Sequence, residues 1–220
     1  MPLKAPPLRA LAARPITTGL GLAAIATTLL SSAGYSIDAL TMTPMAMRGE
    51  PWRLLTSMLP HLGPIHLLFN VYWLWVLGGA IEERCGTRLT VGLILLTGGA
   101  SAALEHALFS GGVGLSGVGY GLFGFAWMAA RRQVAFQDVV DRGVVQTFLV
   151  WFVFCCLTTL TGVFAVANAA HAAGLVVGIF AGVAFSDRRR RALALGATVT
   201  LSVVAIALAT APARAFVNLS

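Results

Sequence analysis

Seven long apolar segments, separated by short stretches that carry charge, proline or glycine, dominate this sequence. They run at approximately 16–33, 65–81, 89–109, 115–130, 144–160, 168–186 and 192–211. A bilayer core about 30 Å thick needs roughly 20 apolar residues per helix, so each segment is close to the length of one crossing. Apolar residues make up 58% of the chain and charged residues 10%, which excludes a soluble domain and a disordered chain. The sequence therefore predicts an all-α membrane protein with seven transmembrane helices.

The basic residues lie mostly between these segments, and alternate gaps differ sharply in how many they hold. One set of gaps holds twelve, namely Lys4, Arg9, Arg14, Arg84, Arg88, Arg131, Arg132, Arg142 and Arg188 to Arg191. The other set holds three, namely Arg48, Arg53 and Arg214. Because Lys and Arg accumulate in cytoplasmic loops, we expect a cytoplasmic N-terminus. The compact loops favour a bacterial inner membrane, and the net charge of +7 indicates topology and not a nucleic-acid partner.

The first apolar segment also fits a secretory signal peptide, because basic residues precede it and the small residues 31–34 follow it. Its apolar stretch is longer than a usual signal-peptide core, which favours a retained helix, and cleavage would leave the later topology unchanged. The long gap at 34–64 holds Trp52, four methionines and prolines 44, 51, 60 and 64, so we expect it to lie in the outer membrane interface. The cysteines Cys85, Cys155 and Cys156 lack a metal-binding spacing and are expected to be free thiols.

Four polar side chains lie inside the predicted spans, where they are costly unless they face a partner or a water-filled cavity. His66 and Asn70 are four residues apart and share one helix face. Ser116 opens the fourth segment, and His171 lies one turn into the sixth. All three segments begin at the outer surface, so at 1.5 Å per residue the four groups lie within roughly 10 Å of it. Each alone is usually structural, but their common depth favours one shared cavity.

Glycine gives a second reason to place the serine beside the second histidine. Ser116 lies in the glycine-rich stretch 111–121, and Gly174, Gly178 and Gly182 follow His171 at four-residue intervals. Small residues on one helix face let two helix backbones approach closely. We therefore expect the fourth and sixth helices to pack tightly.

A hydroxyl beside an imidazole is the arrangement of nucleophilic catalysis, because a neutral imidazole can take the serine proton. Asn70, His66 and the backbone amide of Ser116 are suitable donors for the oxyanion that forms when a serine attacks a peptide carbonyl. A zinc protease is disfavoured because Glu105-His106 has the wrong order for its motif, so we expect no metal and no cofactor. A solute transporter is disfavoured because we expect no repeated half and no buried charge on a span.

These residues resemble the motifs of the rhomboid intramembrane serine proteases. The resemblance covers about residues 15 to 186 and includes Trp52-Arg53, His61-x-x-x-x-His66-x-x-x-Asn70, Leu77-Gly78-Gly79-Ala80-Ile81-Glu82, Gly114-x-Ser116-Gly117 with Tyr120, and Asn168-x-x-His171-x-x-Gly174-x-x-x-Gly178. It implies a six-helix rhomboid-like transmembrane bundle plus one additional C-terminal transmembrane helix. The implied division is a cytoplasmic segment at 1–15, a catalytic core at 16–186, and a basic loop, seventh helix and tail at 187–220.

The resemblance also implies the role of each site residue. Ser116 would be the nucleophile, His171 the general base and acid, and Asn70, His66 and the Ser116 amide the oxyanion hole. The supporting residues would be Tyr120, Gly114, His61, Trp52 and Arg53, with Tyr120 stacked on His171 and His61 near the loop that seals the site. The expected substrates are transmembrane helices of other proteins, in the lipid bilayer. A non-catalytic relative that binds the transmembrane helices of client proteins is the alternative.

Overall fold

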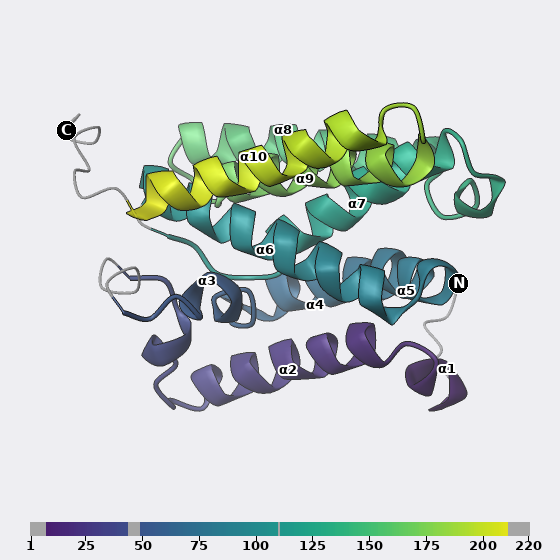
Figure 1. Cartoon of the computed structure of the whole chain (residues 1–220). Helices are drawn as coiled ribbons and strands as arrows, with labels where there is room; N and C mark the ends of the chain where they lie inside the picture. Colours follow the sequence, from purple (N-terminus) through teal and green to yellow (C-terminus); the bar gives the residue numbers. More distant parts are fainter. Residues whose placement is uncertain (1–7, 44–48, 110, 211–220) are drawn as a thin grey trace.

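The computed structural model describes residues 8–43, 49–109 and 111–210, and within these residues the regular elements are helical (Figure 1). The longer elements are α2 (Pro15–Ser32), α4 (Pro64–Trp73), α5 (Gly79–Cys85), α6 (Thr87–Phe109), α7 (Ser116–Ala130), α8 (Arg142–Leu160), α9 (Asn168–Ser186) and α10 (Arg191–Thr210). The shorter ones are α1 (Leu8–Ala12), η1 (Asp38–Leu40), α3 (Arg53–Thr56), η3 (Leu74–Gly78) and η4 (Val134–Phe136). Lys4, Arg48 and Arg214, used in the topology argument, lie outside the described residues, as do Pro44, Met45 and Met47 of the long gap.

Each predicted apolar segment corresponds to a helix, and within the described residues six helices are long and apolar enough to cross a membrane. The helix of the remaining segment, α7, is shorter, with 15 residues. Its side chains Leu122 and Phe123 are fully enclosed by protein. The second helix is longer than predicted. It runs without a break from Pro64 to Cys85, because η3 joins α4 to α5 as one wide helical turn.

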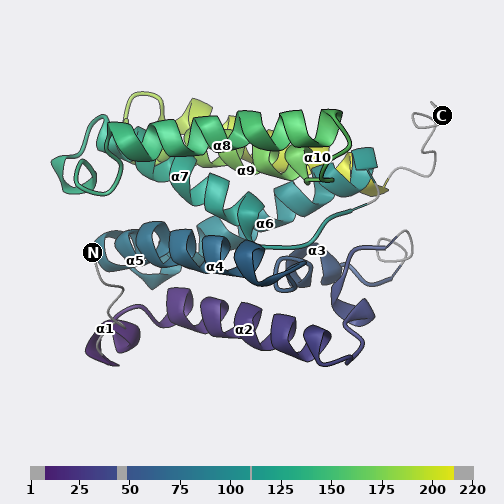
Figure 2. The same cartoon turned by 180° about the vertical axis from the view of Figure 1, so that it is seen from behind.

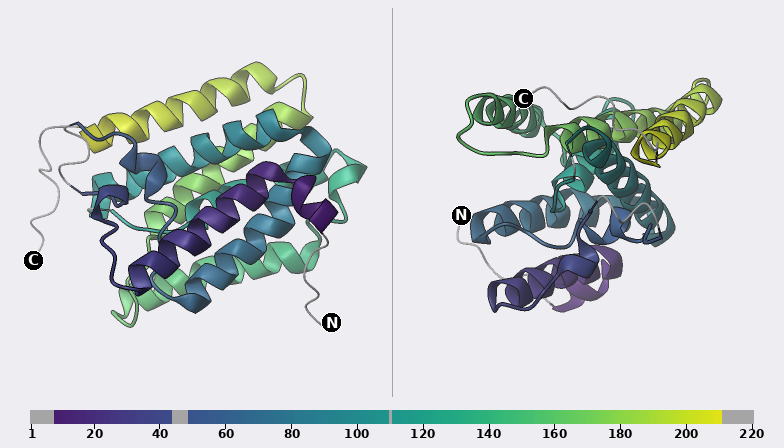
Figure 3. Two further views of the ribbon diagram at one scale, coloured as in Figure 1. Left: turned by 90° about the horizontal axis from the view of Figure 1, so that it is seen from below. Right: turned by 90° about the vertical axis from the view of Figure 1, so that its left-hand side faces the viewer.

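Figures 1 and 2 show how these helices are arranged. Helix α6 crosses between α2 and α4–α5 on one side and the group formed by α7, α8, α9 and α10 on the other. Helices α8 and α10 lie on opposite sides of α9, since α10 is in front in Figure 1 and α8 is in front in Figure 2. From below, α2 lies over α4 and α5 (Figure 3, left). Successive connections alternate between the two ends of the bundle, as expected for a multi-pass membrane protein.

The predicted close packing of the fourth and sixth helices is confirmed. In the contact of α7 with α9, a Cβ atom at Gly174 would overlap the carbonyl oxygen of Gly117, and one at Gly178 would overlap that of Gly121. The two backbones therefore touch directly, which only glycine permits. Since Ser116 begins α7 and His171 lies in the first turn of α9, this contact brings the starts of the two helices that carry them together.

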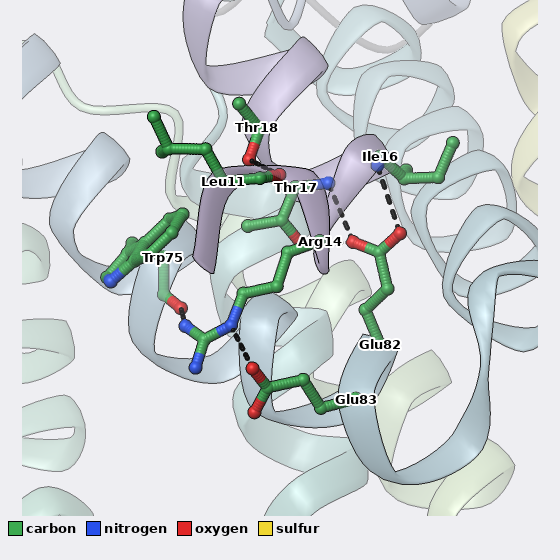
Figure 4. A network of polar contacts seen from close by, with 8 residues as sticks. All are labelled: Leu11, Arg14, Ile16, Thr17, Thr18, Trp75, Glu82 and Glu83. Carbon is green, nitrogen blue, oxygen red and sulfur yellow. Dashed lines mark hydrogen bonds and ion pairs between the residues drawn. The ribbon is translucent and has the colours of Figure 1, made fainter. Parts of the chain in front are cut away.

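A polar network holds the start of α2 against α5 at the basic end of the bundle (Figure 4). The buried carboxylate of Glu82 accepts hydrogen bonds from the backbone amides of Ile16, at 3.0 Å, and Thr17, at 2.9 Å. Beside it, Arg14 forms an ion pair with Glu83 at 2.7 Å and lies over the ring of Trp75. Glu82 thus caps α2, because it accepts amides that have no acceptor within that helix.

The expectation that no span carries a buried charge is wrong. Glu82 is buried in α5 and Glu105 is buried in α6. Both carboxylates accept backbone N–H groups at the start of another helix, which offsets the cost of removing them from water. Sequence patterns within one segment do not reveal such partners, because the partners lie about 65 residues away.

Candidate active site

A cavity of about 710 Å³ opens at the end of the bundle opposite the Glu82 network. Five of the predicted site residues line it, namely His66, Asn70, Ser116, Tyr120 and His171. They come from the first two turns of α4, α7 and α9, which begin at the same end. The structure therefore brings together the four polar groups whose common depth was predicted. Trp52, Arg53, His61 and Gly114 do not line this cavity.

The loop before α7 sets the position of Ser116, which is the first residue of that helix. Gly114 has a φ of +112°, and a Cβ atom there would lie 2.7 Å from Cε1 of His66. A side chain at this position is thus excluded both by the backbone conformation and by the histidine ring. The amide of Gly114 donates to the carbonyl oxygen of Ser57 at 3.1 Å, which ties the loop to the segment before α4.

His61 also holds this loop, through two hydrogen bonds of opposite kind. Its Nδ1 lies 2.9 Å from the carbonyl oxygen of Leu59, and its Nε2 accepts the amide of Leu115 at 3.2 Å. Both bonds form only when the ring is neutral with its proton on Nδ1. Burial, with a further contribution from the nearby His66, lowers the pKa of His61 to about 4, which favours this neutral form.

His171 is 2% exposed and lies against the ring of Tyr120, with ring centroids 4.6 Å apart and planes 28° apart. Tyr120 is itself fixed, because its hydroxyl donates to the carbonyl oxygen of Phe148 at 3.1 Å. Among the described residues, Nδ1 of His171 has no hydrogen-bond partner, and no hydrogen bond joins Ser116 to His171. Packing against an aromatic ring therefore holds the imidazole in place of a carboxylate. Loose nucleophile–base contacts are common where no substrate is bound.

His66 and Asn70 form the third side of the cavity. The side-chain amide of Asn70 donates to the carbonyl oxygen of His66 at 2.9 Å, which fixes its orientation. Nδ1 of His66 accepts the amide of Leu62 at 3.4 Å, so the neutral ring carries its proton on Nε2. Nε2–H is then a hydrogen-bond donor at a cavity that also contains the hydroxyl of Ser116.

Trp52 and Arg53 support the outer loop away from the cavity. Arg53 pairs with Glu50 at 2.6 Å and donates to the carbonyl oxygens of Asp38 and Thr41. These bonds hold the segment that contains η1 against α3. Trp52 is about half exposed, as is typical of a tryptophan at a membrane interface.

The sequence patterns did not predict two features of the cavity. Glu105 lines it, although the Glu105-His106 pair matches no zinc-binding motif. Phe69 of α4 also stacks on Trp151 of α8, with centroids 4.9 Å apart, and both line the cavity. A charged residue in an apolar segment was a usable signal for Glu105, whereas an aromatic contact between two apolar helices leaves no signal in a single sequence.

Comparisons with known proteins agree with the resemblance. The family model of the rhomboid domain matches residues 48–188. The chain is 36% identical over 144 residues to the Rhomboid protease GlpG of Enterobacter sp. (strain 638), covering 64% of this chain and 50% of that protein. It is 35% identical over 152 residues to the Rhomboid protease GlpG of Klebsiella pneumoniae subsp. pneumoniae, covering 67% and 53%. The chain thus spans about half the length of these curated relatives. With a family match over more than half of its residues, this multi-pass membrane protein belongs to the rhomboid family.

Proposed function

We propose that the protein is an intramembrane serine endopeptidase that hydrolyses peptide bonds in or near transmembrane segments of other membrane proteins. One observation supports this most directly. A serine hydroxyl, an imidazole and two further polar side chains line one cavity at the start of three helices. The close glycine contact between α7 and α9 also keeps together the starts of the two helices that carry Ser116 and His171. The names of the curated relatives agree with this activity.

In the proposed reaction, Oγ of Ser116 attacks the scissile carbonyl carbon while His171 takes the hydroxyl proton. His171 then gives that proton to the leaving amine, and an acyl-enzyme remains. A water molecule, deprotonated by His171, hydrolyses the ester and releases Ser116. The amide of Ser116, with Nε2–H of His66 and the side-chain amide of Asn70, donates hydrogen bonds to the oxyanion in both halves of the reaction.

The substrate proposed is a transmembrane helix that enters from the lipid. Apolar side chains of α4 and α8, including Phe69 and Trp151, line the cavity. A helix hides its carbonyls in its own hydrogen bonds, so it must unwind locally before Ser116 can attack. We therefore expect cleavage near small or helix-breaking residues, close to the outer end of the substrate helix. Replacing such residues with leucine is expected to reduce cleavage.

The remaining parts of the proposal concern organisation. Residues 16–186 would form the catalytic core, and 1–15 would be a cytoplasmic N-terminal segment. Residues 187–220 would add a basic loop, a seventh helix and a tail. We place the protein in a bacterial inner membrane, where the cavity faces the outer side and admits water from above.

The decisive test compares Ser116→Ala with the wild type in detergent, with a reporter type I membrane protein as substrate. We expect Ser116→Ala and His171→Ala to abolish cleavage, because no nucleophile or base replaces them. Asn70→Ala should lower kcat less, by roughly 10²-fold, because the other oxyanion donors remain. Ser202→Ala on α10 is the matched control, with wild-type cleavage expected. Equal cleavage by Ser116→Ala and wild type would contradict the proposal, and binding of the substrate without cleavage would favour a non-catalytic helix-binding protein.

A further inference from the structure

A buried carboxylate lies between the two halves of the site. Glu105 of α6 is 5% exposed and lines the same cavity as Ser116 and His171. The proposed mechanism gives it no task, and a carboxylate at this depth is costly unless it is well hydrogen-bonded. The hydrogen bonds and packing contacts of Glu105 therefore indicate its role in the site.

On one side, Glu105 contacts the first turn of α9. This helix has Ala167 at its N-cap position, with no side-chain cap, and alanine is among the weakest capping residues. Oε2 of Glu105 instead accepts the amide of Ala170 at 3.0 Å, and the carboxylate also bonds the amide of Ala169. These amides have no acceptor inside α9, and a negative charge is favourable at a helix N-terminus. Glu105 thus caps, from another helix, the residues immediately before His171.

On the other side, Glu105 contacts the loop that leads to Ser116. A Cβ atom at Gly112 would lie 3.5 Å from Cγ of Glu105 and 2.9 Å from Cβ of Ala167. The loop therefore packs against both the aliphatic part of the Glu105 side chain and the residue before α9. A smaller pocket is lined jointly by Glu105, Gly112, Ser116 and Ala170. The carboxylate lies where the nucleophile loop meets the helix that carries the base.

We propose that Glu105 is a positioning residue, which fixes the height of the first turn of α9 and hence of His171 relative to Ser116. This inference rests on the proposed function. In a Ser-His-Asp triad the carboxylate orients the imidazole, whereas here the carboxylate orients the helix and Tyr120 holds the ring. What matters is an acceptor oxygen at the right distance. Glutamine at this position keeps an acceptor oxygen within reach of the two backbone amides. Aspartate is one methylene shorter, so it keeps the charge but moves its oxygens away from these amides.

The experiment measures kcat and KM for wild type, Glu105→Gln and Glu105→Asp. Because small displacements of a catalytic group have large effects, Glu105→Asp should lower kcat by roughly 10- to 100-fold with KM little changed, while Glu105→Gln should stay within about 3-fold of the wild type. Glu82→Asp is the matched control. It withdraws an equally buried cap from α2, far from the cavity, so it should lower the unfolding temperature without lowering kcat. If Glu105→Asp is as active as Glu105→Gln, or Glu82→Asp loses kcat equally, the proposal is wrong.

Amide hydrogen exchange tests the cap without reference to activity. In the wild type, the amides of Ala169 and Ala170 should exchange as slowly as those in the middle of α9. In Glu105→Asp they should exchange about 10-fold faster, the effect of losing one helix cap, and in Glu105→Gln they should stay slow. Fast exchange in the wild type overturns the cap even if Glu105→Asp does not fold. Slow exchange in a wild type that cleaves nothing would retain the cap and reject the proposed function.

Discussion

At the scale of single residues, His61 shows how a side chain outside the cavity can control the residue that leads to the nucleophile. Its ring accepts the amide of Leu115, the residue before Ser116, and this bond exists only while Nε2 has no proton. A histidine of this kind couples the order of the loop to pH. The resemblance predicted its place near the loop, but only the structure shows which two backbone groups it joins.

We expect a pH dependence of stability that His61 carries in part. Its pKa is about 4 in the folded protein and near 6.5 when unfolded, so between those values the unfolded chain binds more protons. Stability should therefore fall as the pH is lowered from 6.5 to 4. In His61→Gln, which retains an acceptor for the amide of Leu115, the unfolding free energy should depend less steeply on pH over this window. The difference in slope should correspond to the uptake of up to about one proton on unfolding. Thermal unfolding at half-unit pH steps measures it, and identical slopes for the two proteins would contradict the expectation.

At the scale of elements, the contact between α7 and α9 is made by backbone against backbone, and it joins the two helices that carry the proposed dyad. Such a contact has no flexible side chain that can move aside. Four glycines, Gly117, Gly121, Gly174 and Gly178, thus set how closely α7 approaches α9. The same contact explains why α7 tolerates a length of only 15 residues, since its neighbours enclose it.

Gly178→Ala should be strongly destabilising, because its methyl group would overlap the backbone of Gly121. Overpacking of this kind costs about 1–3 kcal/mol, and cleavage should fall with it as Ser116 and His171 move apart. The matched control is Gly92→Ala on the exposed face of α6, where a Cβ meets nothing within 4 Å. That change should stabilise the helix by up to about 1 kcal/mol. Differential scanning fluorimetry of both variants compares them, and equal unfolding temperatures would refute the explanation.

The positions of the helices could be predicted from the sequence, because an apolar run of the length of a bilayer has one stable form in lipid. The shared cavity of Ser116, His171, His66 and Asn70 could be predicted, because successive spans alternate in direction and because glycines recur at four-residue intervals after His171. The extension of the second helix to Cys85 was not, since its last turn is polar and reads as a loop. Nor were the roles of Glu82 and Glu105 as caps, because each depends on a helix start that lies far along the chain.

At the scale of the whole molecule, the two ends of the bundle differ in kind. One end has the basic residues, the Arg14–Glu83 pair and the Glu82 cap. A second basic group, Arg132 and Arg190, pairs there with Asp187 after α9. The other end has the cavity and the long connection before α4. This difference gives the molecule a fixed direction in the membrane.

The proposed direction can be tested by labelling single cysteines in a variant that lacks the three native ones. Ser36→Cys lies in an exposed loop at the cavity end, and Arg189→Cys lies in an exposed turn at the basic end. A membrane-impermeant maleimide should label Ser36→Cys in intact cells, and Arg189→Cys only after permeabilisation, with at least a 10-fold difference for each, because the bilayer blocks the reagent. The reverse pattern would show the opposite orientation.

The shortness of α7 determines how far beneath the lipid headgroups chemistry takes place. Fifteen residues at 1.5 Å each span about 22 Å, less than the roughly 30 Å of hydrocarbon. With its last residue, Ala130, at the basic end of the bundle, a helix of this length does not reach the opposite surface, and its first residue, Ser116, lies below that surface. The depth of Ser116 below the surface thus depends on the number of residues in α7. A single residue inserted into α7 would raise the Ser116 side chain and rotate it by about 100° away from the His171 imidazole.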